Sequence, residues 1–245
     1  MDSPAPASSS PAATTSPVAA RGSSWPAEAA AVFVKDWRCE FRNRYALNTL
    51  GLFAVTTLVV VSMVLGPAGA APQLAATVLP VILWLIVLFA VTAGLPRVFV
   101  AEEETHTATA LRLAATPSAL FCGKLAYGFT VVLALEALIT PLFLAMVQME
   151  ARRPGLLAVA LVAGGYGLSV GSTLVAAMVA QARSRSALFA VLLLPVLVPG
   201  LLFAVQLTRA AVAGETPGQE LQMLLLYDAT LTVAGLMLFP PVWNP

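Results

Sequence analysis

Apolar residues occupy six long runs along the chain, and the segments between the runs carry glycine, proline or charge. Each run approaches the roughly 20 residues that a helix needs to cross the hydrocarbon core of a bilayer. The runs cover residues 46–65, 74–95, 125–147, 156–180, 187–207 and 221–239. The pattern predicts an all-α membrane protein with about six transmembrane helices.

A shorter amphipathic segment, residues 27–45, precedes the first run. Its apolar residues recur at three- and four-residue steps from Ala30 to Tyr45, and charged residues fill the opposite face. A basic polar face and aromatic apolar residues next to a hydrophobic run favour a helix lying in the membrane interface. A soluble amphipathic helix packed on another domain is the alternative.

Residues 1–26 are mostly alanine, serine, proline and threonine, and they contain no apolar core of a signal peptide. Such a segment buries too little apolar surface to offset its chain entropy. We therefore expect a disordered tail over residues 1–26 and one helical domain over residues 27–245.

The longest internal connection lies between the second and third runs and contains the segment AEEETHTATALRLAAT. Glu102, Glu103 and Glu104 suit the positive end of a helix macrodipole, and Thr116–Pro117 is typical of an N-cap followed by a first-turn proline. We expect a short amphipathic cytoplasmic helix here, at the place where a separate motor subunit would contact the protein. A solvated surface helix explains the same pattern equally well.

Composition supports a lipid environment. Hydrophobic residues make up 59% of the chain, charged residues 10%, and the mean hydropathy is +0.88. Soluble domains carry roughly 25% charged residues, so this chain has too little polar surface to cover itself in water. The net charge of +1 gives no indication of a nucleic-acid partner.

Basic residues predict the orientation, because cytoplasmic loops are enriched in lysine and arginine. With the N-terminus inside, the cytoplasmic side holds ten of the thirteen basic residues: Arg21, Lys35, Arg38, Arg42, Arg44, Arg97, Arg112, Lys124, Arg183 and Arg185. Arg152, Arg153 and Arg209 fall outside. Both termini are therefore predicted to be cytoplasmic, in a bacterial inner membrane.

The chain offers no catalytic set. It has no GxxxxGK[ST] loop for ATP, and no GxSxG or HExxH motif. Its single histidine, His106, excludes a multi-histidine metal site or a bis-histidine haem site within one copy. We expect a protein that is not an enzyme and that binds no metal or resident cofactor.

Two carboxylates fall inside the apolar runs. Glu136 lies twelve residues after Lys124, roughly 18 Å along a helix and near the membrane midplane. A charge there costs about 2.5–3.5 kcal/mol, so Glu136 should face the bundle interior, where desolvation favours its neutral form. It is either a pathway or coupling residue or a helix–helix hydrogen bond. Asp228, about two turns into the last run, is interpreted first as a structural pair and otherwise as a coupling residue.

Small residues and prolines mark close packing and bends. Ala163, Gly167 and Gly171 fall four residues apart, a pattern that serves packing within one chain as well as dimerisation. Pro195 and Pro199 make the fifth run the one expected to be broken.

The chain from Lys35 to Trp243 resembles the CcmB family, the membrane subunit of the haem-exporter-type ABC transporter of cytochrome c maturation. The similar segments are KDWRCEFRNRY (35–45), GLPRVFVAEEETHTATALRLAATPSALFCGK (94–124), LEALITPLF (135–143), GSTLVAAMVAQARSRSALFAVLLLPVLVP (171–199) and YDATLTVAGLMLFPPVW (227–243). Their order and spacing agree with six spans in an ABC-2-like permease bundle.

The resemblance implies a permease that works with a separate ABC ATPase subunit and with other cytochrome c maturation membrane proteins. Haem is then a substrate of the complex. The resemblance places five residues on the cytoplasmic, ATPase-facing side: Arg38, Arg42, Glu102, Glu103 and Glu104. A homodimer within a larger complex is expected by analogy with two-permease transporters.

Other functions stay open at this point. An ABC-2-type exporter of a lipid, glycan or drug would have the same architecture, and so would a non-transporting scaffold that assembles a membrane complex. An intramembrane enzyme ranks last, because no catalytic residues support it.

Overall fold

The computed structural model describes residues 24–43, 45–65, 76–95, 115–180 and 185–243. Within these ranges the chain forms seven helices: α1 (Trp25–Asn43), α2 (Tyr45–Leu65), α4 (Leu79–Gly94), α7 (Pro117–Val147), α8 (Pro154–Ala180), α9 (Arg185–Ala213) and α10 (Gln219–Trp243). The predicted all-α class is confirmed, and each of the six apolar runs contains a helix.

Four helices, α7 to α10, are long and apolar enough to cross a membrane, whereas α2 and α4 contain shorter apolar helices, Asn48–Val64 and Leu79–Gly94. The outward faces are apolar as well as the inward ones. Leu52 and Met63 on α2 are 72% and 81% exposed, and Met237 on α10 is 72% exposed. Helices that are apolar all round need protein or lipid on every side. The chain is therefore a multi-pass membrane protein.

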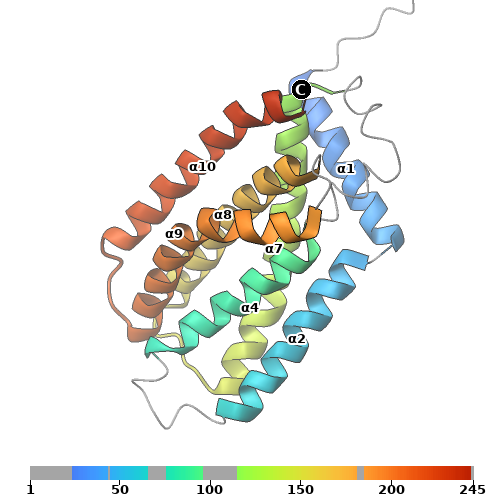
Figure 1. Ribbon diagram of the computed structural model, residues 1–245. Helices are drawn as coiled ribbons and strands as arrows, with labels where there is room; N and C mark the ends of the chain where they lie inside the picture. The colour runs from blue at the N-terminus through green and yellow to red at the C-terminus, as the bar shows by residue number, and fades with distance from the viewer. Residues whose placement is uncertain (1–23, 44, 66–75, 96–114, 181–184, 244–245) are drawn as a thin grey trace, which may run out of the picture.

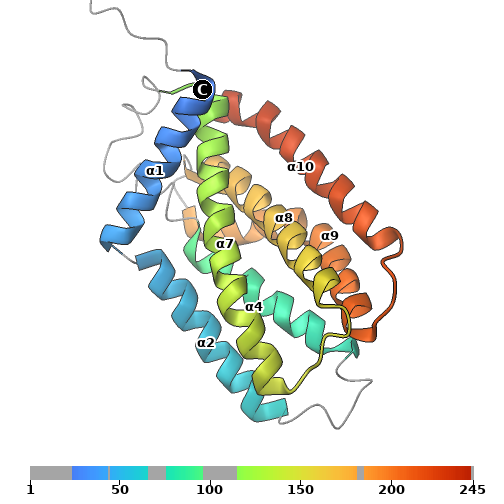
Figure 2. The same cartoon turned by 180° about the vertical axis from the view of Figure 1, so that it is seen from behind.

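Helix α8 is the centre of the bundle. It packs against α7, α9 and α10, and Figures 1 and 2 show it between α7 and the α9–α10 pair. Figure 2 also shows α7, the longest helix, with α1 beside its first half and α2 beside its second half. At 31 residues α7 is about 46 Å long, more than the hydrocarbon core requires.

The start of α7 lies where the sequence predicts it, with Thr116 as N-cap and Pro117 in the first turn. The Thr116 side chain makes no capping bond of its own. Instead, Glu28 of α1 supplies the acceptor: its Oε2 receives hydrogen bonds from the Thr116 backbone N and from Oγ1, both at 2.9 Å. A carboxylate here also complements the helix macrodipole, so α1 both caps and anchors α7.

The predicted N-terminal tail is too long by two residues. Helix α1 begins at Trp25, two residues inside the predicted tail of residues 1–26, and Trp25 Nε1 donates a 3.0 Å hydrogen bond to Ser118 Oγ. Residues 1–23 lie outside the described part of the chain. The amphipathic helix predicted between the second and third runs falls on residues 96–114, which also lie outside it, together with Glu102, Glu103 and Glu104.

Arg152, which the basic-residue distribution puts on the less basic side, caps the end of α9. Its Nη1 donates to the Ala213 carbonyl at 3.3 Å, and the Arg153 backbone N donates to the Ala211 carbonyl at 3.0 Å. Gly214 follows with φ of +84° and closes the helix with a bond from its N to Ala210 O, a conformation that favours glycine. A positive charge at a helix C-terminus is stabilising, and this explains the presence of the basic residue Arg152 on the less basic side of the protein.

Candidate functional site

Three glycines of α8 each make room for a side chain from a different helix. A Cβ added at Gly164 would overlap the ring of Trp84, and one at Gly165 would lie 2.8 Å from Glu136 Oε2. A Cβ at Gly167 would overlap the carboxylate of Asp228. The three side chains come from α4, α7 and α10 respectively. Of the predicted small-residue face, Gly167 lies against Asp228 and Gly171 against Leu197, so both glycines serve packing within the chain; Gly164 and Gly165 were not part of that prediction.

Glu136 is buried at the α7–α8 contact, as its position in the apolar run predicts. The residue is 2% exposed, and neither carboxylate oxygen has a hydrogen-bond partner among the described residues. The helix–helix hydrogen bond considered from the sequence is therefore not found there. A buried ionised carboxylate without a partner is strongly unfavourable. Thr140, one turn further along α7, also has a buried and unpartnered Oγ1.

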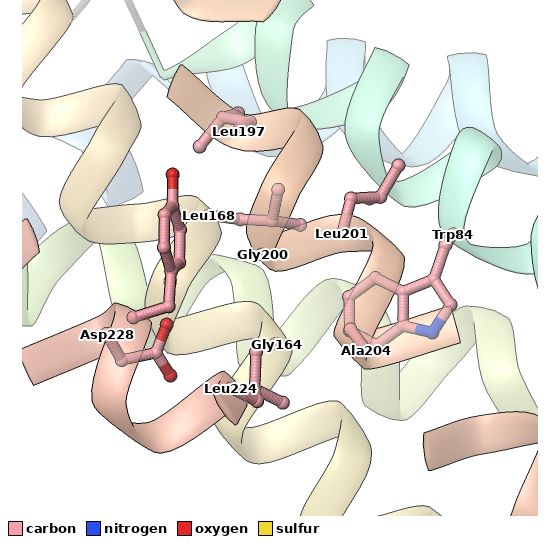
Figure 3. A pocket seen from close by; sticks show the side chains of 11 residues that line it. Trp84, Gly164, Leu168, Leu197, Gly200, Leu201, Ala204, Leu224 and Asp228 are labelled. Carbon is pink, nitrogen blue, oxygen red and sulfur yellow. The ribbon is translucent and has the colours of Figure 1, made fainter. Parts of the chain in front are cut away.

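Asp228 borders a small cavity between α4, α8, α9 and α10 (Figure 3). The residue is 4% exposed and both of its carboxylate oxygens lack a partner among the described residues, so the expected structural pairing is not found there. The volume of the cavity is only about 10 Å³, and its wall includes Trp84, Leu201 and Tyr227. Ligand sites for drug-sized molecules usually measure about 300–1,000 Å³, so this cavity as it stands is too small for haem.

Two aromatic side chains fix the walls of this cavity. Trp84 Nε1 donates to Thr208 Oγ1 at 2.9 Å, which ties α4 to α9. The hydroxyl of Tyr227 donates to the Val196 carbonyl of α9, between Pro195 and Pro199. Both prolines lie inside one continuous helix, so the break expected in the fifth run is not found. Proline removes a backbone donor and weakens a helix locally, and Tyr227 supports α9 at that place from α10.

A buried ion pair joins α1 to α7. Lys124 Nζ lies 3.4 Å from Asp36 Oδ2, and the two side chains are 1% and 5% exposed. Lys35 Nζ, which is 36% exposed, lies 3.0 Å from the other oxygen of Asp36. One turn along α7, the Tyr127 hydroxyl donates to Glu40 Oε2 at 3.3 Å. The sequence places Asp36 and Glu40 among the charged residues opposite the apolar face of α1, and both side chains contact α7.

Arg38 and Arg42 lie one turn apart on α1 and are exposed, in agreement with a surface role.

Glu136 and Asp228 do not form one cluster. Glu136 contacts α8 at Gly165, and Asp228 contacts it at Gly167. Two residues of a helix are about 200° apart around its axis, so the two carboxylates lie on opposite sides of α8. Within the described ranges no three histidine, cysteine, aspartate or glutamate side chains converge in a way that could hold a metal ion.

Sequence reasoning missed Trp84, Lys124 and Asp36 as residues of the buried polar contacts. The partners of Lys124 and Trp84 lie 88 and 124 positions away along the chain. The only local signal was that Lys124 and Asp36 each stand next to an apolar residue of the kind that packs in a protein core.

The described helices define a polytopic α-helical membrane protein with two buried carboxylates, Glu136 and Asp228. The family model described as CcmB protein matches residues 27–241, and the chain belongs to that family. It is 32% identical over 214 residues to a protein named Heme exporter protein B from Rhodobacter capsulatus, covering 86% of this chain and 94% of that one. It is 29% identical over 164 residues to a protein of the same name from Bradyrhizobium diazoefficiens, covering 66% of this chain and 72% of the other.

Proposed function

We propose that this chain is the membrane-embedded permease subunit of a haem exporter that serves c-type cytochrome biogenesis. The observation that carries the proposal is the family match, which covers residues 27–241 and so all of the described helices except two residues at the start of α1 and two at the end of α10. The Rhodobacter capsulatus relative, named a haem exporter, aligns over 94% of its own length. A shared function is therefore supported by the whole helical domain rather than by one motif.

We propose six membrane spans, with α2 and α4 added to the four long helices. Helix α2 has 21 residues, about 31 Å, which matches the ~30 Å hydrocarbon core. Its inward residues Leu50, Ala54 and Leu58 pack in the same cluster as α4 and α7 residues, while its outward face is apolar. Helix α4 as described has 16 residues, and the apolar run that contains it begins at residue 74.

The basic-residue distribution supports an inner-membrane protein with both termini in the cytoplasm. In that orientation the first turns of α7 and the last turns of α10 lie at the cytoplasmic end. The structure is consistent with their common level, since the rings of Phe121 and Phe239 pack with centroids 5.3 Å apart. Helix α1, with its exposed Trp25, Val34 and Phe41, would lie along the cytoplasmic interface of the bilayer.

ATP hydrolysis would take place in a separate ABC ATPase subunit. Arg38 and Arg42 are exposed on α1 and are available to contact it, and Glu102, Glu103 and Glu104 complete the proposed contact. Other cytochrome c maturation membrane proteins, and a second copy of this chain, are the further partners that we propose. Haem would be the cargo of the complex and not a resident cofactor of this chain.

The test is the haem-stained c-type cytochrome content of a host that lacks its own copy of this subunit. The host is compared with and without this chain, in both cases with the cognate ATPase. Restored haem staining is expected. Absence of restoration, with membrane insertion and ATPase association both verified, would contradict the proposal and favour an exporter permease for another substrate.

A further inference from the structure

The carboxyl group of Asp228 is a buried polar group that the proposed function does not use. The residue is 4% exposed, and neither Oδ1 nor Oδ2 has a hydrogen-bond partner among the described residues. Roughly 90% or more of buried polar groups in proteins have a partner. Loss or gain of a proton does not meet this need, because a carboxylate requires donors and a carboxylic acid requires both a donor and an acceptor.

The polar side chains around the carboxyl group are already used elsewhere. Besides Asp228, only Trp84 and Tyr227 bring a polar side-chain atom to the wall of the cavity, and the other residues of the wall are glycine, alanine and leucine. Trp84 Nε1 donates to Thr208 Oγ1 at 2.9 Å, and the Tyr227 hydroxyl donates to the Val196 carbonyl. Neither aromatic donor is therefore available to Asp228.

The cavity that Asp228 borders has the size of one water molecule. Its volume is about 10 Å³, and a single water needs roughly 10–15 Å³. Figure 3 shows the Asp228 carboxyl group turned toward the space among the residues that line the cavity. A bound water also needs about two to four polar partners, so one carboxyl group has to be supplemented.

Three glycines of the cavity wall leave the helix backbone uncovered. They are Gly164 and Gly167 of α8 and Gly200 of α9. A peptide carbonyl has two lone pairs, and the bond within the helix uses one of them. Backbone carbonyls of the wall can therefore accept a second hydrogen bond, which supplies the partners that a water needs in addition to Asp228.

A metal ion does not fit the same space. Among the residues that the structure describes, no three histidine, cysteine, aspartate or glutamate side chains come together, so Asp228 would be the only charged ligand. Ca²⁺ takes about six to eight oxygen ligands, and Mg²⁺ usually keeps several of its waters. A cavity with room for one water holds neither set of ligands.

The site lies well inside the apolar part of α10. Asp228 comes nine residues after Gln219, the first residue of this helix, which is about 14 Å along its axis. Apolar cavities stay dry, so space alone does not retain a water at this depth. The carboxyl group is the feature that distinguishes this cavity from an ordinary packing defect.

We propose that this cavity is a binding site for a single water molecule, with the carboxyl group of Asp228 as its main partner. The water donates to an oxygen of the carboxylate, or accepts from the O–H of the carboxylic acid. It donates its remaining hydrogen to a backbone carbonyl of the cavity wall. The water thus gives α10 a polar contact with its neighbours that the side chains themselves do not make. This inference does not rest on the proposed function.

The experiment is X-ray radiolysis of the purified full chain in lipid nanodiscs, followed by mass spectrometry of its peptides. Radiolysis of a bound water releases a hydroxyl radical, which oxidises the side chains beside it. Trp84 is the reporter, because it lines the cavity and is 0% exposed. Phe143 is also 0% exposed but does not line the cavity, so it measures the background. After correction for the intrinsic reactivity of the two rings, Trp84 should be oxidised faster than Phe143.

Substitutions of Asp228 separate the carboxyl group from the space beside it. Asp228→Ala enlarges the cavity but removes the hydrogen bond to the water, so the oxidation of Trp84 should fall about tenfold. Asp228→Asn should keep the oxidation, since an amide both donates and accepts. Glu136→Ala is the matched control and should behave as the wild type. It also removes a buried carboxyl group without a described partner, but Glu136 does not line the cavity.

If Asp228→Ala does not fold, Asp228→Leu replaces it, because the leucine side chain occupies the space and offers no hydrogen bond. Three results would overturn the proposal: Trp84 oxidised no faster than Phe143 in the wild type, unchanged oxidation in the folded alanine or leucine variant, or an equal loss in Glu136→Ala. The measurement needs neither haem nor the ATPase, so its failure is distinct from failure of the proposed function.

Discussion

Replacement of Lys124 by methionine should destabilise the bundle by about 3 kcal/mol. The substitution keeps the apolar length of the side chain and leaves the Asp36 carboxylate, 5% exposed, without its buried partner. Removing one member of a buried ion pair typically costs about 3–5 kcal/mol. We expect the lower end of that range, because Lys35 still contacts the other oxygen of Asp36 at 3.0 Å.

Two further variants separate the buried charge from general effects of substitution. Lys35→Met removes the partly exposed partner of the same aspartate, and exposed pairs contribute about 1 kcal/mol or less. Asp36→Leu combined with Lys124→Met removes both buried charges, and replacement of a buried pair by apolar residues is often neutral or stabilising. The double variant should therefore recover to within about 1 kcal/mol of the wild type.

The assay is unfolding of the purified full chain in mixed micelles by titration with a denaturing detergent, followed by circular dichroism. The free energies of unfolding of the wild type and the three variants are compared under one set of conditions. If Lys124→Met and Lys35→Met lose the same free energy, or if the double variant is as unstable as Lys124→Met, the buried-pair argument is wrong.

Three other predictions concern the candidate site and the α1 surface. Gly167→Ala should lower the unfolding free energy by about 1–3 kcal/mol, because its Cβ would overlap a carboxylate of α10, whereas Gly155→Ala meets nothing within 4 Å and should be neutral in the same titration. Glu136→Leu should reach normal membrane abundance on immunoblots yet abolish haem staining of c-type cytochromes, while Glu136→Lys should lower abundance; normal staining in the leucine variant would remove the functional role. Arg38→Glu with Arg42→Glu should reduce co-purification of the ATPase subunit without changing stability, and undiminished co-purification would exclude that contact.

The helical architecture could be predicted from the sequence, because a long apolar run is recognised from its residue types alone. The start of α7 at Thr116–Pro117 was also predictable, since capping chemistry is local. The end of α9 was not: the helix continues to Ala213, six residues past the apolar run that ends at residue 207. Gly214 and the Arg152 side chain set that end, and Arg152 lies on another element.

The site was predictable only in part. A carboxylate near the middle of an apolar run must point inward, which identified Glu136 as buried, whereas the burial of Asp228 was not predicted. The sequence did not predict which surface each would meet, because helix periodicity does not say which face packs on which neighbour. For the same reason the sequence did not predict that Asp36, on the charged face of α1, is buried against Lys124.

The three glycines of α8 also restrict how the bundle can move. Side chains from α4, α7 and α10 pack directly against Gly164, Gly165 and Gly167, where there is room only for the hydrogen atom of glycine. Turning or sliding α8 by one residue would bring Ala163, Tyr166 or Leu168 to a position that admits no side chain. A transport cycle that keeps these contacts must therefore carry α4, α7, α8 and α10 as one rigid body. Bending is then left to α9, which contains Pro195 and Pro199 within one continuous helix.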